Sequence, residues 1–257
     1  MTKVVIIRGR NPETMVPMGL DALGARASRT KIVVKPNLIS NRPYPITTPA
    51  ETVEAVITYF KNSGREFIIA EGSGWSKTLE VYRDRGYLEI AGKHGVRLVD
   101  LNRDEYEVRR SPNVLTLREF EFPLTLKDSY LISAPVLKRH SITGVTLSLK
   151  NMLGATVGGN KGRFHSLGIN ECIVDINRYK APDLAVIDGR KSVSSELGGR
   201  TREFNLMIFS EDPVAADAVG ADTLGFNPLS IKHLKMAHEM GLGVADLRDI
   251  EVVELEA

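Results

Sequence analysis

A basic stretch without a single carboxylate lies near the middle of the sequence, at residues 137–154, LKRHSITGVTLSLKNMLG. Its charged or titratable side chains are Lys138, Arg139, His140 and Lys150, and they lie among several serines and threonines. Lysine and arginine form charge-assisted hydrogen bonds with carboxylate and phosphate groups. The residue types in this stretch therefore indicate a site for a small anionic ligand, with a histidine that could move a proton.

The acidic residues are distributed unevenly, although the formal net charge of the 257-residue chain is only +2. No acid lies between Asp21 and Glu51 or between Asp128 and Glu171, while the whole chain holds 32. A solvated surface normally mixes both signs of charge. We therefore favour an anion site over a solvated basic loop that faces the acidic surface of a partner, and the second interpretation stays open.

Apolar strand-like runs alternate with helical patterns along the chain, which is typical of an α/β fold with a mainly parallel sheet and flanking helices. The expected strands are residues 3–7, 31–35, 67–70, 130–136, 184–187, 205–209 and 251–255. The expected helices are residues 13–27, 49–61, a segment from about 77, 165–179, a segment that Asp212 caps, and 228–240.

The middle of the chain, from about 96 to 126, has a less regular pattern. Short strands at 99–101, 106–109 and 114–117 would form a small irregular or antiparallel insertion, or a subdomain, within a single domain of residues 1–257. A chain of this length can bury one full-sized core.

One expected helix has a distinct start signal. Thr48 and Glu51 fit a Thr-x-x-Glu capping box, with Pro49 in the first turn. The apolar stripe of this helix consists of Val53, Val56, Ile57 and Phe60. Residues 62–64, Asn-Ser-Gly, provide the stop.

Polar residues follow several of the expected strands directly. Ligands of open parallel sheets bind beyond the carboxyl ends of the strands, which directs attention to residues 35–37, 71–74, 134–138 and 188–189. The 72–74 turn, Gly-Ser-Gly, lacks the third glycine of a dinucleotide fingerprint, so an ordinary tight turn and an anion contact both stay open. The candidate ligand-binding residues are Lys35, Asn37, Gly72, Gly74, Lys138, Lys150 and Asn151.

Three residues could take part in proton transfer or hold a metal, namely His140, His165 and Asp188. The glycine-rich segment 158–163 precedes His165 and carries Lys161, which fits either a mobile lid or a simple surface loop. A lone histidine is more often structural, so this catalytic group is a hypothesis. The pattern does not identify a metal.

The spacing of further polar residues along the expected helices predicts which of them share a helix face. Thr146 and Lys150 are four residues apart and would share one helix face. His233 and His238 are five apart, which does not fit a shared face, so we expect them to be surface or capping residues.

The chain contains one cysteine, Cys172, which we expect to be a small buried residue. One cysteine cannot form an intrachain disulfide or an iron–sulfur cluster bound by this chain alone. No apolar run approaches the roughly 18 residues that span a bilayer, so we expect a cytoplasmic protein without a membrane segment. The basic segments lack interleaved aromatic residues, which argues against nucleic acid as a partner.

Six segments, taken in order, resemble the domain of unknown function 362 family, over about residues 30–243. They are 32–38 (IVVKPNL), 47–49 (TTP), 136–140 (VLKRH), 144–151 (GVTLSLKN), 183–189 (DLAVIDG) and 210–214 (SEDPV). The resemblance implies an α/β fold but no reaction. The resemblance also implies that many relatives carry cysteine motifs for four-iron, four-sulfur clusters. This chain lacks these motifs, so a redox role would need a partner that supplies the electron carrier.

The order of lysine, histidine and glycine between Lys138 and Lys161 is also similar to that of lactate-racemase-type enzymes. These use paired histidines in proton and hydride chemistry on a hydroxy acid, which suggests a substrate class. The sequence thus predicts a cytoplasmic enzyme for a small carboxylate or phosphate. The alternative is a non-catalytic binding or scaffold protein that docks an acidic or iron–sulfur redox partner.

Overall fold

The computed structural model describes residues 1–61 and 64–257. Within these ranges the strands form one eight-stranded sheet, in the order β12-β1-β11-β10-β7-β2-β3-β4, and two separate hairpins. The strands of the sheet are β1 (Thr2–Arg8), β2 (Lys31–Pro36), β3 (Glu66–Glu71), β4 (Arg97–Asp100), β7 (Ser129–Ala134), β10 (Leu184–Ser195), β11 (Gly198–Ser210) and β12 (Ile250–Glu256). Of these eight, β11 runs against the other seven. The predicted α/β fold with a mainly parallel sheet is confirmed.

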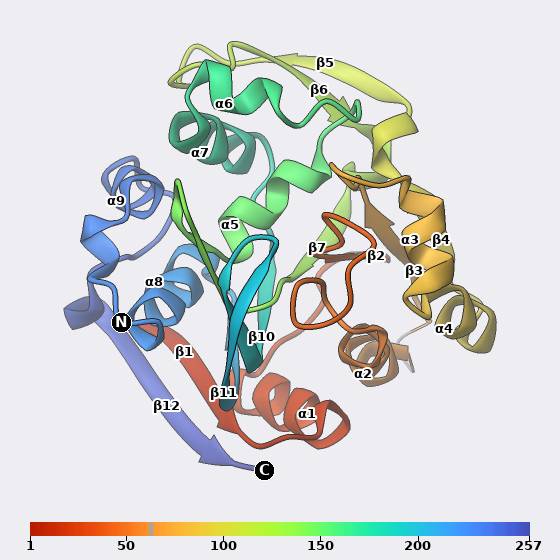
Figure 1. The fold of residues 1–257 in the computed structure, drawn as a ribbon, viewed down its shortest axis with the longest axis vertical. Coiled ribbons are helices and arrows are strands. Elements are labelled where there is room, and N and C mark those ends of the chain that lie inside the picture. Colours follow the sequence, from red (N-terminus) through yellow and green to blue (C-terminus); the bar gives the residue numbers. More distant parts are fainter. Residues whose placement is uncertain (62–63) are drawn as a thin grey trace.

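Helices cover both faces of the sheet (Figure 1). They are α1 (Pro12–Leu23), α2 (Ala50–Phe60), α3 (Thr78–Asp84), α4 (Tyr87–His94), α5 (Ser148–Asn151), α6 (Arg163–Leu167), α7 (Ile169–Tyr179), α8 (Pro213–Thr223) and α9 (Lys232–Glu239). Alternate residues of a strand point to opposite faces. Accordingly, Val5 and Ile7 pack in the core with α1 and α2, whereas Val4 and Ile6 pack with α8 and α9.

The insertion in the middle of the chain is smaller than the predicted 96–126. The first predicted strand, 99–101, overlaps β4, which belongs to the large sheet and runs parallel to β3. The separate antiparallel hairpin consists of β5 (Tyr106–Arg110) and β6 (Glu119–Pro123). Residues 114–117 form a loop rather than a strand, because their backbone amides donate three hydrogen bonds to the Asp175 carboxylate of α7.

One of the two predicted helix caps is present. Asp212 accepts hydrogen bonds from two backbone amides at the start of α8. Thr48 does not cap α2, because its hydroxyl instead accepts a hydrogen bond from the Asn37 amide and donates one to the Ala134 carbonyl. Glu51 forms an ion pair with an arginine of β10 rather than completing a capping box. The start of α2 is thus fastened to the ends of β2 and β7.

Glycines end or interrupt two predicted helices. The first ends at Leu23 rather than at residue 27, because Gly24 takes a left-handed conformation with φ of 73°. Gly168, with φ of 95°, divides the predicted helix 165–179 into α6 and α7. The stop predicted for α2 at 62–64 lies partly outside the described residues.

Candidate functional site

A cavity of about 500 Å³ lies beyond the carboxyl ends of β2, β3 and β7, because Asn37, Gly74 and Lys138 follow these strands and line it. Seven of the ten predicted site residues line this cavity. They are Asn37, Gly74, Lys138, His140, Lys150, Asn151 and His165. The other three, Lys35, Gly72 and Asp188, do not. The strand-end rule therefore located the region of the cavity correctly.

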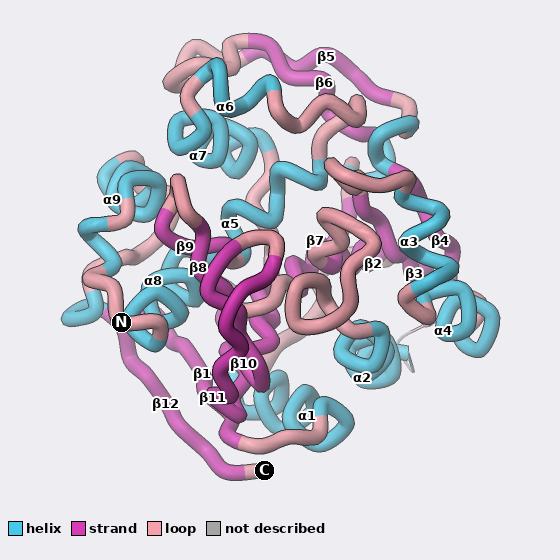
Figure 2. The backbone as a smooth tube through the Cα atoms, viewed as in Figure 1, coloured by secondary structure: helices cyan, strands magenta, loops and turns pink. Residues whose placement is uncertain are grey.

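One wall of the cavity is a hairpin that Figure 2 shows beside the β10–β11 hairpin. The hairpin consists of β8 (Lys138–His140) and β9 (Gly144–Thr146). Side chains alternate along a strand, so Lys138 and His140 face the cavity while Arg139 points away and stacks on Phe226. Thr146 lies opposite Lys138 in the register, and its buried hydroxyl has no hydrogen-bond partner among the described residues.

Lys138 is buried and forms no ion pair with any carboxylate in the described chain. Its ammonium donates hydrogen bonds to Asn37 Oδ1 and to the Ile46 carbonyl, both at 2.7 Å. Burial, followed by the positive charge of Lys150, lowers the pKa of Lys138 to about 7. A bound anion would favour its charged form.

Lys150 belongs to α5, the short helix that follows β9. Asp217 of α8 accepts hydrogen bonds from the Ser148 and Leu149 amides, at 2.7 and 2.8 Å, and so fixes the start of α5. The Lys150 ammonium forms no hydrogen bond or ion pair with any residue that the structure describes. Burial lowers the pKa of Lys150 to about 8, although Glu196 acts in the opposite direction.

Thr146 and Lys150 do not share a helix face, contrary to the prediction from their spacing. Helix α5 begins only at Ser148, so Thr146 lies in β9. Both residues nevertheless line the cavity, because the chain turns directly from β9 into α5.

Lys35 is fully buried and forms an ion pair with Glu71 at 2.9 Å. Its ammonium also donates to Asn151 Oδ1 at 2.9 Å. Burial lowers the pKa of Lys35 in spite of Glu71. Because Glu71 compensates the charge, the position of Lys35 does not support the predicted direct contact with the ligand. Asn151, which also accepts a hydrogen bond from Asn37, connects this ion pair to the cavity wall.

The two glycines of the 72–74 turn have different environments. A Cβ atom at Gly72 would lie 2.8 Å from both Asn102 Oδ1 and the Gly154 carbonyl. Glycine is therefore required there for the close packing of chain segments, as in an ordinary tight turn. Gly74 instead lies in the cavity wall, where a ligand can approach it.

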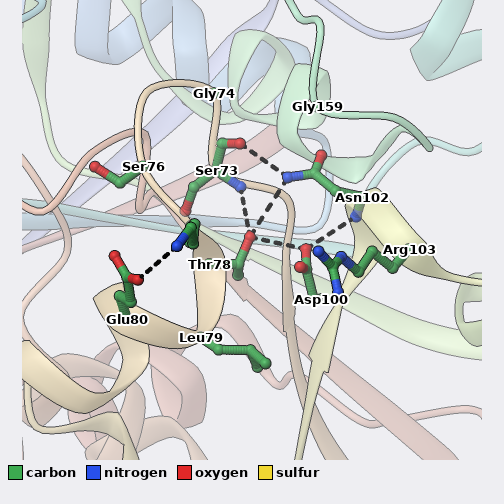
Figure 3. A pocket seen from close by; sticks show the side chains of 11 residues that line it. Ser73, Gly74, Ser76, Thr78, Leu79, Glu80, Asp100, Asn102, Arg103 and Gly159 are labelled. Atoms are coloured by element: carbon green, nitrogen blue, oxygen red, sulfur yellow. Dashed lines mark hydrogen bonds and ion pairs between the residues drawn. The ribbon is translucent and has the colours of Figure 1, made fainter.

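A second cavity, of about 480 Å³, adjoins the first at Gly74 and Gly159 (Figure 3). In it, the Thr78 hydroxyl accepts a hydrogen bond from the Ser73 amide and donates one to the Asp100 carboxylate. Its lining includes two basic residues, Lys77 and Arg103, and two acidic residues, Glu80 and Asp100, so the excess of positive charge belongs to the first cavity.

His140 is held as a neutral hydrogen-bond donor. Its Nδ1 accepts hydrogen bonds from the Ile142 and Thr143 amides, at 3.1 and 3.3 Å, so the ring proton resides on Nε2. Burial, followed by the charge of Lys150, lowers the pKa of His140 to about 4. The ring can donate a hydrogen bond to a ligand oxygen, whereas a second proton at Nδ1 would break the contacts with the amides.

The other two predicted catalytic residues do not lie together. His165 is an exposed residue of α6 that lines the cavity. Asp188 is fully buried and accepts hydrogen bonds from Thr52 and Arg190. The predicted convergence of Asp188 with the two histidines is therefore absent, and the described part of the chain contains no group of three His, Cys, Asp or Glu residues placed to hold a metal.

Lys161 lines the cavity from the glycine-rich segment 158–163. Its ammonium donates to the carbonyl and the hydroxyl of Thr156, at 2.6 and 2.9 Å. Burial lowers the pKa of Lys161 to about 7. These two hydrogen bonds hold the Lys161 ammonium in the cavity wall, so it is not a freely exposed cation of the loop.

Glu196 is a cavity residue that the sequence did not reveal. It lies in the turn between β10 and β11, where it accepts hydrogen bonds from the amide and the hydroxyl of Ser141. Burial raises its pKa, but hydrogen bonds from the Glu196 and Ser141 amides outweigh this effect, so the pKa falls to about 2. The predicted strand ended at 187, whereas β10 continues to Ser195 and carries Glu196 to the cavity.

Two further predictions concern residues outside the wall. His233 is fully buried, contrary to the expected surface position, and burial lowers its pKa to about 3. His238 is partly exposed and accepts a hydrogen bond from the Ala245 amide. Cys172 is buried, as predicted.

Residues 32–222, which include the β8–β9 hairpin, α5 and most of α8, match the family described as "Domain of unknown function (DUF362)". The chain belongs to this family. The resemblance found in the sequence motifs is thereby confirmed. The sole Cys172 cannot hold a cysteine-ligated cluster within this chain.

Among curated proteins, the chain is similar to the thylakoid-associated protein sll1697 of Synechocystis sp. (strain PCC 6803), with 27% identity over 214 residues. The similar region covers 77% of this chain and 65% of the relative, so the chain spans slightly less than two thirds of that protein. No helix among the described residues is both long and apolar enough to cross a bilayer.

Among solved structures, the lactate racemase apoprotein from Thermoanaerobacterium thermosaccharolyticum superimposes with a TM-score of 0.56 and 12% sequence identity. The superposition covers 87% of this chain and 57% of that chain. At this level of identity the similarity concerns the fold.

Proposed function

We propose that the 500 Å³ cavity binds a small carboxylate and is the active site of an enzyme that acts on it. The supporting observation is an imbalance of charge. Lys138, Lys150 and Lys161 line the cavity, and Glu196 is the one carboxylate among its described lining residues. Because burial lowers the pKa values of all three lysines, a bound anion would gain strong charge-assisted hydrogen bonds and restore their charged forms.

The individual side chains suit different tasks in such a site. The free ammonium of Lys150 would pair with the carboxylate, next to Lys138. The Thr146 hydroxyl and the His140 Nε2–H would donate to further ligand oxygens, since neither has another partner among the described residues. His165, on the exposed side, would exchange a proton between ligand and solvent.

The fold similarity to a lactate racemase apoprotein makes 2-hydroxy acids the first ligand class to test. The concave shape of the site favours a small ligand over the acidic surface of a partner protein. Docking of an acidic or iron–sulfur partner stays a prediction from the sequence.

Binding is tested by titration calorimetry of lactate, glycolate, pyruvate and inorganic phosphate at pH 7. We expect Lys150→Gln to weaken carboxylate binding by about tenfold or more, since a hydrogen bond to a charged group contributes about 1.5–3 kcal/mol. Lys235→Gln, on the exposed side of α9, is the matched control and should bind as the wild type does. If wild-type protein binds none of the acids, or if Lys150→Gln binds them equally well, the proposal is wrong; preferential phosphate binding would correct the ligand class.

Catalysis is tested separately by incubating L-lactate or glycolate with the protein in D₂O. Exchange of the proton on the carbon next to the carboxylate, followed by NMR, would reveal enzymatic proton transfer. We expect His165→Asn to slow this exchange without a comparable loss of binding. Binding without exchange of either acid would overturn proton transfer at this carbon as the reaction of the site.

A further inference from the structure

The lysines around the cavity differ in whether their ammonium groups are engaged. That of Lys35 is held by a carboxylate, that of Lys138 by an amide oxygen and a backbone carbonyl, and that of Lys161 by a carbonyl and a hydroxyl. Lys150 lacks any such partner in the part of the chain that the structure describes. Its nitrogen is therefore the one among these four that is free to approach a ligand atom.

A lysine acts as a nucleophile when its amine is neutral and its electron pair is free. Burial in a cavity and a neighbouring cation both favour the neutral amine. Lys150 lies in the cavity wall, where burial lowers its pKa against the opposing charge of Glu196. Lys138 is its neighbouring cation, since the charge of Lys150 in turn lowers the pKa of Lys138. With a pKa of about 8, roughly a tenth of the Lys150 amine is neutral at pH 7.

We propose that Lys150 forms a reversible imine with the carbonyl carbon of a small 2-oxo acid bound in this cavity. The inference rests on the proposed function, because the same cavity has to bind the carboxylate of the acid. With a 2-oxo acid, Lys150 engages the carbonyl carbon, and the other donors of the wall hold the carboxylate in place of the Lys150 ammonium. Lys138 and Thr146 face each other across the hairpin and provide an ammonium and an unpartnered hydroxyl for this purpose.

The reaction needs no oxidant or reductant. The Nζ electron pair adds to the carbonyl carbon, and the electron pair of the C=O double bond moves to the oxygen. The two protons of the neutral amine are then transferred to this oxygen, which leaves as water while the C=N double bond forms. Addition of water reverses the step and releases the acid.

Two histidines are suited to assist these proton movements. His140 presents Nε2–H as a donor to the carbonyl oxygen, because its Nδ1 is occupied by backbone amides. His165 lines the exposed side and can pass protons to water. The remaining charged wall residues, Lys161 and Glu196, are held by Thr156 and Ser141.

The test is reductive trapping of the full chain with pyruvate and sodium borohydride, followed by intact-mass and peptide mass spectrometry. Reduction fixes an imine as a secondary amine, which adds the mass of one pyruvic acid less one oxygen atom. We expect one such adduct per chain, mapped to Lys150. Lys150→Arg keeps the positive charge but lacks the nucleophile, so we expect the trapped fraction to fall by about tenfold or more. Lys235→Arg is the control and should be trapped at Lys150 as in the wild type.

The outcomes separate this inference from the proposed function. Calorimetric binding of lactate and pyruvate without an adduct would overturn the imine and leave the carboxylate site intact. Absence of both binding and adduct would overturn both. An adduct spread over exposed lysines, or mapped to Lys138, would also overturn the assignment to Lys150. Peptide mapping of the wild-type protein decides the question even if Lys150→Arg does not fold.

Discussion

At the scale of single residues, the hydroxyl of Thr146 supports the proposed ligand site. It is buried in the cavity wall, opposite Lys138, without a hydrogen-bond partner in the described chain. A buried polar group without a partner costs about 1–3 kcal/mol of folding free energy. Such a cost is expected where a ligand supplies the missing partner.

We therefore predict opposite effects of Thr146→Val on stability and on binding. Valine has nearly the same shape and also suits a strand, so the free energy of unfolding of the ligand-free protein should rise by about 1 kcal/mol. Carboxylate affinity should fall by about three- to tenfold, because a hydrogen bond is lost. Urea denaturation and calorimetry measure the two quantities. Unchanged affinity would show that the hydroxyl does not contact the ligand.

At the scale of elements, α5 is too short to be stable by itself and depends on Asp217. The two carboxylate oxygens of Asp217 accept hydrogen bonds from the Ser148 and Leu149 amides. Asp217 is fully buried, and burial raises its pKa to about 8 in spite of these two hydrogen bonds. The position of Lys150 thus depends on a carboxylate of α8 that does not touch the cavity.

Asp217→Asn should destabilise the protein and loosen the site together. The amide of asparagine keeps one acceptor but turns an N–H group toward the second backbone N–H, so we expect a loss of about 1–3 kcal/mol in the free energy of unfolding. Carboxylate affinity should also fall, because α5 carries Lys150. Asp222→Asn, exposed on the same helix, is the control. A variant that loses stability but binds normally would contradict the role assigned to Asp217.

The same elements show what could be predicted from the sequence. The alternation of strands and helices predicts parallel strands, whose carboxyl ends lie at the same edge of the sheet. Asn37 and Lys138 both follow such strands, so the sequence predicted that they lie close together. The sequence did not predict Glu196 as a cavity residue. The second half of β10, which leads to it, has no strand-like apolar pattern and is a strand because its backbone pairs with β11. The hydrogen bond of the Thr48 hydroxyl also depends on tertiary structure. It donates to the carbonyl at the end of β7, and the predicted capping contact at the start of α2 does not form. Local patterns indicated the region of the cavity, but long-range contacts determined which charged side chains remain without a partner in its wall.

At the scale of the whole molecule, the fold buries lysines of the cavity wall whose charges are only partly compensated, which makes the free energy of unfolding depend on pH. Lys138 and Lys161 have pKa values of about 7 and Lys150 of about 8, whereas an ordinary lysine titrates near 10.5. Between these values the unfolded chain binds more protons than the folded protein. The free energy of unfolding should therefore rise with pH in this interval and fall as pH decreases through the folded pKa values.

For the ligand-free protein we predict a rise in stability from about pH 8 to 10, with a slope of up to about 1.4 kcal/mol per pH unit for each lysine. Urea denaturation at several pH values measures it, and Lys150→Met should show a smaller rise because it removes one of the three groups. Carboxylate affinity should decline over the same interval, since the ammonium groups lose the protons that attract the ligand. Stability that stays constant or falls between pH 8 and 10 would mean that these lysines remain charged in the folded protein, and the neutral amine required for attack on a carbonyl would then be scarce.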